Sequence, residues 1–82
     1  MKFELFSRAA IAIDLPEHNL KRGDIVTIVE VLPSNTQHVS GYIVEVFSVT
    51  GETLDVVGLL ETQLMALRAN AVPAMREMAE AA

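Results

Sequence analysis

Hydrophobic residues along the chain fall into short runs rich in Val, Ile and Leu, and polar segments containing Gly, Pro, Asn or Asp separate these runs. Short apolar runs bounded by such residues are typical of β-strands joined by turns. The segment Leu60 to Leu67 does not follow this strand pattern throughout, and it predicts a short helical turn that leads into a final edge strand. The four longer runs predict strands over residues 8–13, 25–32, 42–48 and 53–59.

Turn signals separate these runs at the expected places. Pro16 disfavours helical geometry at Leu15 and ends the first strand. The pair Gly23-Asp24 predicts a turn in which glycine adopts a φ angle that other residues avoid. Thr50 to Glu52 predicts a hairpin turn, whereas residues 33–41 form a longer polar connection. The order of these strands and turns predicts a mainly β fold. We expect a small five-stranded SH3-like barrel over residues 1–68 and a C-terminal tail with a short helix over residues 69–82.

Alternation within the third and fourth runs indicates which side chains face the core. Val44 and Val46 share one face of their strand, and Leu54 and Val56 share one face of theirs, opposite Asp55. We expect these two faces to form the core. The opposite faces are more apolar than solvent exposure requires, so we expect a partner to cover them. The strand residues predicted to contact that partner are Val26, Ile43, Phe47, Val57 and Leu59.

The tail has the pattern of an amphipathic helix. Val72-Pro73 fits a helix start, and residues 74–82 are rich in strong helix formers. Because an isolated helix of this length is marginal in water, it needs a surface to pack against. A frayed tail, a helix on its own barrel and a helix on a neighbouring subunit remain alternatives. The tail residues predicted to lie at an interface are Val72, Met75 and Met78.

Size and composition add one constraint to this picture. A chain of 82 residues buries only part of its surface, yet 51% of its residues are hydrophobic. We therefore expect some apolar surface to remain for a partner.

The absence of cysteine predicts no disulfide framework and favours a reducing compartment. Residues 1–6 do not resemble a signal peptide, and no run is long enough to span a membrane, so we predict a cytoplasmic protein.

The net charge of −5 is distributed unevenly along the chain. No Lys or Arg occurs between Gly23 and Leu67, which is most of the predicted barrel. Nucleic-acid binding requires clustered cations, so this surface disfavours a nucleic-acid partner and suits a basic protein better. The acidic residues of this segment are Asp24, Glu30, Glu45, Glu52, Asp55 and Glu61.

Residues able to carry chemistry are few. His18 and His38 lie in predicted loops without the spacing of a metal site, and surface histidines explain them better. Glu45 and Asp55 lie on adjacent predicted strands, but two solvated carboxylates are a better explanation than an acid–base pair. The tripeptide at 22–24 matches an integrin-binding motif, and its turn role accounts for it. We predict no catalytic residue, no metal and no cofactor.

Several segments occur in a recognisable order: Asp14 to Glu17, Leu20 to Ile25, Val29 to Leu32, Gly41 to Phe47, Gly51 to Leu54 and Leu60 to Leu64. Together they resemble a small bacterial family of domains of unknown function, numbered 4926, over roughly residues 5–67. Val26 stands where the family pattern has glycine, and the tail from Asn70 lies outside the resemblance. The resemblance implies a compact SH3-like barrel without catalytic residues. It also implies genes that lie beside those of toxin-like proteins, and hence an antitoxin-like or immunity-like role.

Two functional hypotheses follow. The first is a non-enzymatic protein-binding module that neutralises a protein partner by covering a basic surface. The second is a self-associating structural or accessory subunit, such as a homodimer, with no inhibitory role. An RNA-binding barrel ranks below both because of the charge distribution.

Overall fold

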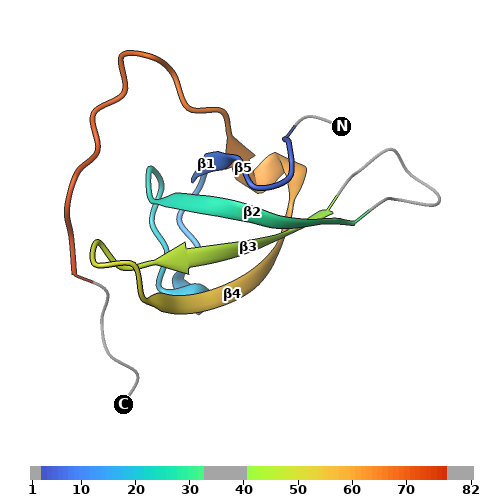
Figure 1. Ribbon diagram of the computed structural model, residues 1–82, viewed down its shortest axis with the longest axis horizontal. Helices are drawn as coiled ribbons and strands as arrows, with labels where there is room; N and C mark the ends of the chain where they lie inside the picture. The colour runs from blue at the N-terminus through green and yellow to red at the C-terminus, as the bar shows by residue number, and fades with distance from the viewer. Residues whose placement is uncertain (1–2, 33–40, 78–82) are drawn as a thin grey trace.

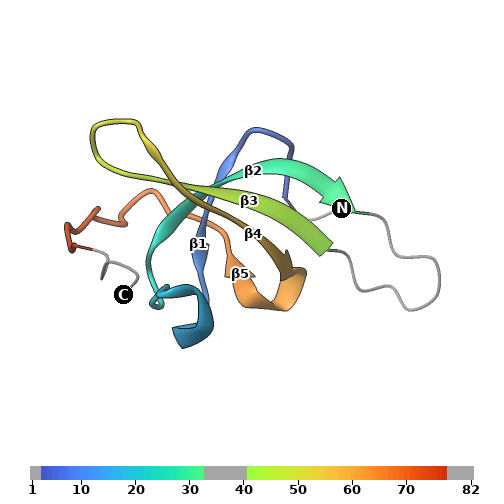
Figure 2. The same ribbon diagram turned by 90° about the horizontal axis from the view of Figure 1, so that it is seen from below.

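A computed structural model describes residues 3–32 and 41–77. It contains one sheet of five antiparallel strands that curls into a half-barrel, and the strand order is β4-β3-β2-β1-β5 (Figures 1 and 2). This confirms the mainly β prediction, and the order is compatible with an SH3-like barrel. The strands are β1 (Arg8–Ile11), β2 (Ile25–Leu32), β3 (Gly41–Phe47), β4 (Thr53–Leu60) and β5 (Leu64–Met65).

Two short 3₁₀ helices interrupt the strands, η1 (Pro16–His18) and η2 (Glu61–Gln63). The second leads directly into β5, as the sequence predicts. The first predicted strand is shorter than expected, because it ends at Ile11 and Ile13 is exposed.

Glycines close the two tight turns. Gly23 has φ +94° and Gly51 has φ +93°, a region that side-chain-bearing residues rarely adopt. The backbone N–H of Gly51 donates to the carbonyl of Ser48 at 3.0 Å, which closes the β3–β4 hairpin. Both predicted turns are therefore confirmed.

Irregular pairing at two points accompanies the curl of the sheet. One register shift lies between Ile28 and Glu30, and another lies between Val46 and Phe47. Extra residues at such points bend a strand and increase its twist. The second shift leaves one additional residue in β4, Leu54, between the residues that pair with Val46 and Phe47.

The core lies on the concave side of the sheet. Its largest fully buried side chains are Tyr42, Ile11, Leu20, Ile28, Val26 and Val44. Phe3 packs edge-on against Tyr42, with ring centroids 5.4 Å apart. Leu15 and Leu20 cover one end of the core and pair through their backbones.

The predicted core face of β3 is correct and that of β4 is wrong. Val44 and Val46 are buried, whereas Leu54 and Val56 are exposed. The register pairs Val44 with Val57, so the opposite face of β4 turns inward. Val26, Val57 and Leu59 were expected on an outer face, and this is also wrong because all three are core residues.

No helix forms in the described part of the tail. Residues 66–77, hereafter the strap, run without regular secondary structure from β5 back over the molecule (Figure 1). Val72 is 85% and Met75 is 78% exposed, so the predicted apolar stripe has no surface to pack against. Without packing, a short helix lacks its main source of stability, and the predicted C-terminal helix is not observed. Met78 lies outside the described residues.

Candidate protein-binding face

The side of the sheet opposite the core carries a continuous set of apolar side chains. Cross-strand pairing places Ile43 opposite Gly58, and Gly41 opposite both Leu32 and Leu60. Glu45 faces Val56 in the same way. We call this the outer face, and its apolar side chains are Leu32, Ile43, Phe47, Val56 and Leu60.

Several of these side chains are exposed to solvent, and two of them lie over glycines of the neighbouring strand. Val56 is 55%, Leu60 is 50% and Phe47 is 42% exposed. A Cβ atom on Gly58 would lie 3.6 Å from Cδ1 of Ile43, so Ile43 lies over that glycine. Leu32 lies over Gly41 in the same way. The resulting surface is broad and apolar, which is the character of an interface core.

Negative charge surrounds this apolar surface. Glu30 and Glu45 belong to the outer face, and the Thr53 hydroxyl donates a hydrogen bond to the Glu45 carboxylate. Glu52 lies directly before β4, whereas Glu61 directly after β4 is engaged by the hydroxyl of the buried Tyr42. Because residues 24–67 contain no Lys or Arg, no cation from these strands offsets the acids. The part of the outer face formed by β2, β3 and β4 therefore carries negative charge only.

Strand β4 adds a free sheet edge to this face. It is the terminal strand in the pairing order, so its far side has no partner strand among residues 3–32 and 41–77. Exposed edges usually carry lysine, proline or inward-pointing charge against unwanted pairing. Asp55 is the only charged residue of β4 and pairs with the buried Val46, so it is the one inward-pointing charge on this edge, and Leu54 beside it is 48% exposed.

The predicted interface residues divide into four groups. Ile43 and Phe47 lie on the outer face, whereas Val72 and Met75 lie on the exposed strap. Val26, Val57 and Leu59 contribute to the core, and Met78 falls outside the described residues. The sequence pattern did not single out three outer-face residues, Leu32, Val56 and Leu60. Val56 was missed because the predicted face of β4 was inverted, and Leu60 was missed because it was assigned to the helical turn.

The residues considered for chemistry do not converge. Glu45 faces Val56 and Asp55 faces Val46, so the two carboxylates project to opposite sides of the sheet and cannot act as a pair. His18 ends η1, and His38 lies outside the described residues. Within residues 3–32 and 41–77, no three His, Cys, Asp or Glu side chains are grouped closely enough to hold a metal ion. In the same part of the chain, no helix is long and apolar enough to cross a membrane.

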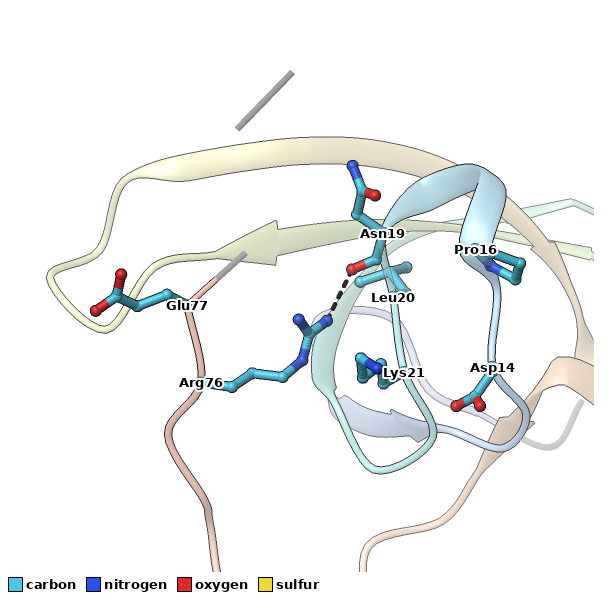
Figure 3. A pocket seen from close by; sticks show the side chains of 7 residues that line it. All are labelled: Asp14, Pro16, Asn19, Leu20, Lys21, Arg76 and Glu77. Atoms are coloured by element: carbon cyan, nitrogen blue, oxygen red, sulfur yellow. Dashed lines mark hydrogen bonds between the residues drawn. The ribbon is translucent and has the colours of Figure 1, made fainter. Parts of the chain in front are cut away.

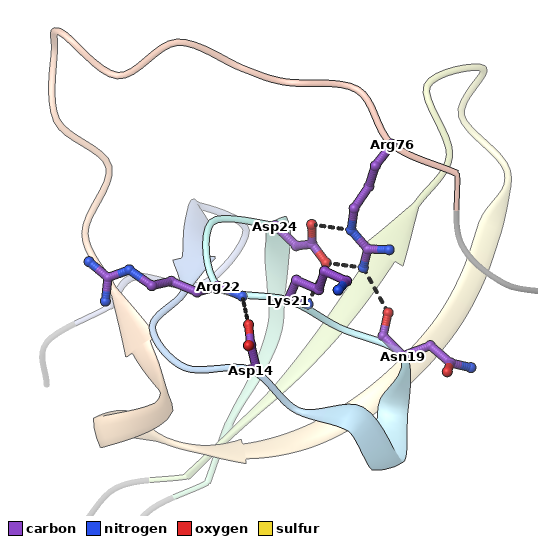
Figure 4. A network of polar contacts seen from close by, with 6 residues as sticks. All are labelled: Asp14, Asn19, Lys21, Arg22, Asp24 and Arg76. Carbon is purple, nitrogen blue, oxygen red and sulfur yellow. Dashed lines mark hydrogen bonds and ion pairs between the residues drawn. The ribbon is translucent and has the colours of Figure 1, made fainter.

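One arginine of the strap, Arg76, attaches it to the turn that precedes β2. Nε of Arg76 donates to Asp24 at 2.9 Å, and its terminal nitrogen donates to Asp24 and, at 2.7 Å, to the carbonyl of Asn19 (Figure 4). The Lys21 backbone N–H also donates to Asp24, at 2.8 Å. Partial burial raises the pKa of Asp24, but the hydrogen bonds and charges of Arg76 and Lys21 outweigh burial and leave that pKa below its usual 3.8.

A hollow of about 450 Å³ lies beside this attachment (Figure 3). Arg76 and Glu77 form its strap side, and Asp14, Asn19 and Lys21 contribute to its opposite side. The Arg76 guanidinium is already engaged by Asp24 and Asn19. Its role in this hollow is therefore to attach the strap, and the hollow lacks the convergent free polar groups of a ligand site.

Comparison with known proteins identifies the family. No curated protein and no solved structure matches the chain significantly. A family model described as a domain of unknown function, DUF4926, matches residues 5–66, which include every strand of the sheet. The match spans more than half of the chain, and the chain therefore belongs to the DUF4926 family.

Proposed function

We propose that this protein is a non-enzymatic protein-binding module whose docking surface is the outer face. One observation carries the proposal: on β2, β3 and β4 the outer face combines exposed apolar side chains with glutamates, and these three strands contribute no cation. Burial of its apolar area supplies affinity, while the acidic surroundings select the partner and accelerate encounter. The curled five-stranded sheet, an SH3-like barrel in this proposal, holds the face rigid.

The partner that fits this surface is a basic protein. Glutamates around an apolar centre match cations around an apolar centre on the partner, which is a common arrangement in interfaces. The antitoxin-like role implied by the family resemblance is the most concrete form of this function. In it, a bacterial cytoplasmic protein covers the basic active surface of a toxin.

A pair of matched variants tests the proposal. Val56→Lys places a cation on the outer face opposite Glu45, and Val72→Lys makes the same change on the strap. Both side chains are exposed, so we expect both variants to fold, as circular dichroism will verify. Tagged full-length protein purified from its own cells should carry one stoichiometric basic partner. We expect Val56→Lys to lose that partner and Val72→Lys to retain it. Equal retention by both variants would refute the proposal.

Self-association is the second candidate, and the free edge of β4 favours it. A second copy pairing edge to edge would extend the sheet through backbone hydrogen bonds. Sedimentation of the purified protein should then show a dimer, and Leu54→Lys should disperse it. A monomer at about 100 μM would exclude this candidate, because obligate subunits associate well below that concentration.

A further inference from the structure

A second hollow lies at the β5 end of the sheet, and β4 is the strand at the other end of the pairing order. This hollow is a groove of about 980 Å³ between the strap and the outward sides of β1, β5 and the start of β2. Its floor includes one cross-strand row, in which Ala10 is paired with Ile25 on one side and with Met65 on the other. All strap residues are exposed, so the strap does not fill the groove with its own side chains.

The charge of this groove is opposite to that of the rest of the protein. Arg8, Arg22 and Arg68 line it, and they are half of the six Lys and Arg residues in the chain. No Asp or Glu belongs to its lining. In a protein of net charge −5, a cluster of cations without carboxylates forms a local positive field that attracts anions.

The arginine side chains of the groove have hydrogen-bond donors to spare. Among the described residues, no hydrogen bond or ion pair engages the side chains of Arg8 and Arg68. Arg22 donates once, to the carbonyl of Ala12 at 3.0 Å, and its side chain points away from the Asp24–Arg76 pair (Figure 4). A guanidinium has five N–H donors in a planar fork that matches a carboxylate. The groove therefore presents unsatisfied carboxylate-binding groups beside an apolar floor.

We propose that this groove binds an extended acidic peptide segment with alternating carboxylate and apolar side chains. Carboxylates would pair with Arg8 and Arg68, and apolar side chains would lie on the row formed by Ala10, Ile25 and Met65. The groove is as large as the largest small-molecule pockets, so it suits a chain segment better than a small ion. This site carries the opposite charge to the outer face of β2, β3 and β4 and draws on β1, β5 and Ile25 at the start of β2, whereas the outer-face residues of β2 are Glu30 and Leu32.

Fluorescence anisotropy with a defined probe tests the site. The probe is a short fluorescein-labelled peptide of alternating Glu and Leu, titrated with the full-length protein at low salt. We expect saturable binding, and we expect Arg8→Gln and Arg68→Gln each to weaken it about fivefold, the usual upper range for one exposed ion pair. Lys21→Gln is the matched control, since it removes one cation outside the groove lining and should change affinity less than about twofold.

Several outcomes would overturn the proposal. Absence of saturable binding would do so, as would an equal loss of affinity in Lys21→Gln, which would indicate attraction to net charge alone. A Lys-Leu peptide that binds as tightly would show that charge complementarity plays no part. Tighter binding of a single-stranded RNA of similar length, with a steep salt dependence, would assign the arginines to phosphate instead.

Discussion

Gly23 shows how one residue sets the geometry of a turn. Its φ of +94° lets the chain reverse between Arg22 and Asp24, and its N–H donates to the carbonyl of Ile11 at 2.8 Å. The turn thereby ties the start of β2 to the end of β1. The motif at residues 22–24 is explained by this geometry, and the glycine was recognisable in the sequence because few other residues serve there.

Replacing this glycine should cost measurable stability. Gly23→Ala meets no steric clash, but it forces a side chain into the left-handed region, and we expect the free energy of unfolding to fall by about 1–2 kcal/mol. Gly58→Ala is the matched control: its new methyl group makes an ordinary 3.6 Å contact with Ile43, and we expect a change below about 0.5 kcal/mol. Urea unfolding measures both. Equal effects in the two variants would contradict this reasoning.

Tyr42 is a residue whose role the sequence did not reveal. Its ring is fully buried, its hydroxyl accepts from the backbone N–H of Phe3 at 3.3 Å, and the same hydroxyl donates to Glu61 at 3.1 Å. These partners lie 39 and 19 positions away along the chain. Alternation places a residue on a face of its strand, but it contains no information about contacts that form only when distant segments meet.

Strand β4 illustrates the limit of prediction at the level of an element. Its existence and nearly all of its length followed from the sequence, yet its two faces were inverted. Leu54, Val56, Val57 and Leu59 are all apolar, so either face is a plausible core face. The choice depends on the register shift at Val46 and Phe47, a feature of pairing between strands that neither strand encodes alone.

The strap is the element whose attachment should depend on pH. Because Asp24 has a lowered pKa in the folded protein, its pairing with Arg76 stabilises the fold above the unfolded-state pKa near 3.9. That stabilisation is lost as pH falls through the lower folded-state value. We expect wild type to exceed Arg76→Gln in free energy of unfolding by less than about 1 kcal/mol at pH 7, and by a smaller amount once Asp24 is protonated and the hydrogen bond to the Asn19 carbonyl remains.

Urea unfolding over a pH series measures this difference. Arg68→Gln provides the control, because it removes the same charge from a strap position without an ion-pair partner among the described residues. Its stability should track wild type at every pH. A difference between wild type and Arg76→Gln that is as large at the lowest pH as at pH 7 would show that the Asp24 carboxylate contributes nothing to the attachment of the strap.

At the scale of the whole molecule, charge is separated between two flanks. The acidic flank was visible in the sequence, since residues 24–60 lack cations and contain β2, β3 and β4. The basic flank was not visible, because Arg8, Arg22 and Arg68 are far apart in sequence and meet only where β1 lies between β2 and β5. The charge of one continuous segment can be read from the sequence, whereas the meeting of residues far apart in sequence can be recognised only once the strand order is known.

The half-barrel should fold without the strap. Residues 66–77 are all exposed and contribute nothing to the core, and Arg76 is their only side-chain anchor to the sheet among the described residues. A chain ending at Arg68 should therefore unfold cooperatively in urea with a free energy within about 1 kcal/mol of the full chain, because it loses one surface ion pair and no buried side chain. A shallow or absent transition would show that the tail completes the core.

The truncated chain also separates the two proposed surfaces, since it keeps the whole outer face and removes one wall of the arginine groove. Partner binding through the outer face should survive this truncation, while affinity for the acidic peptide should fall.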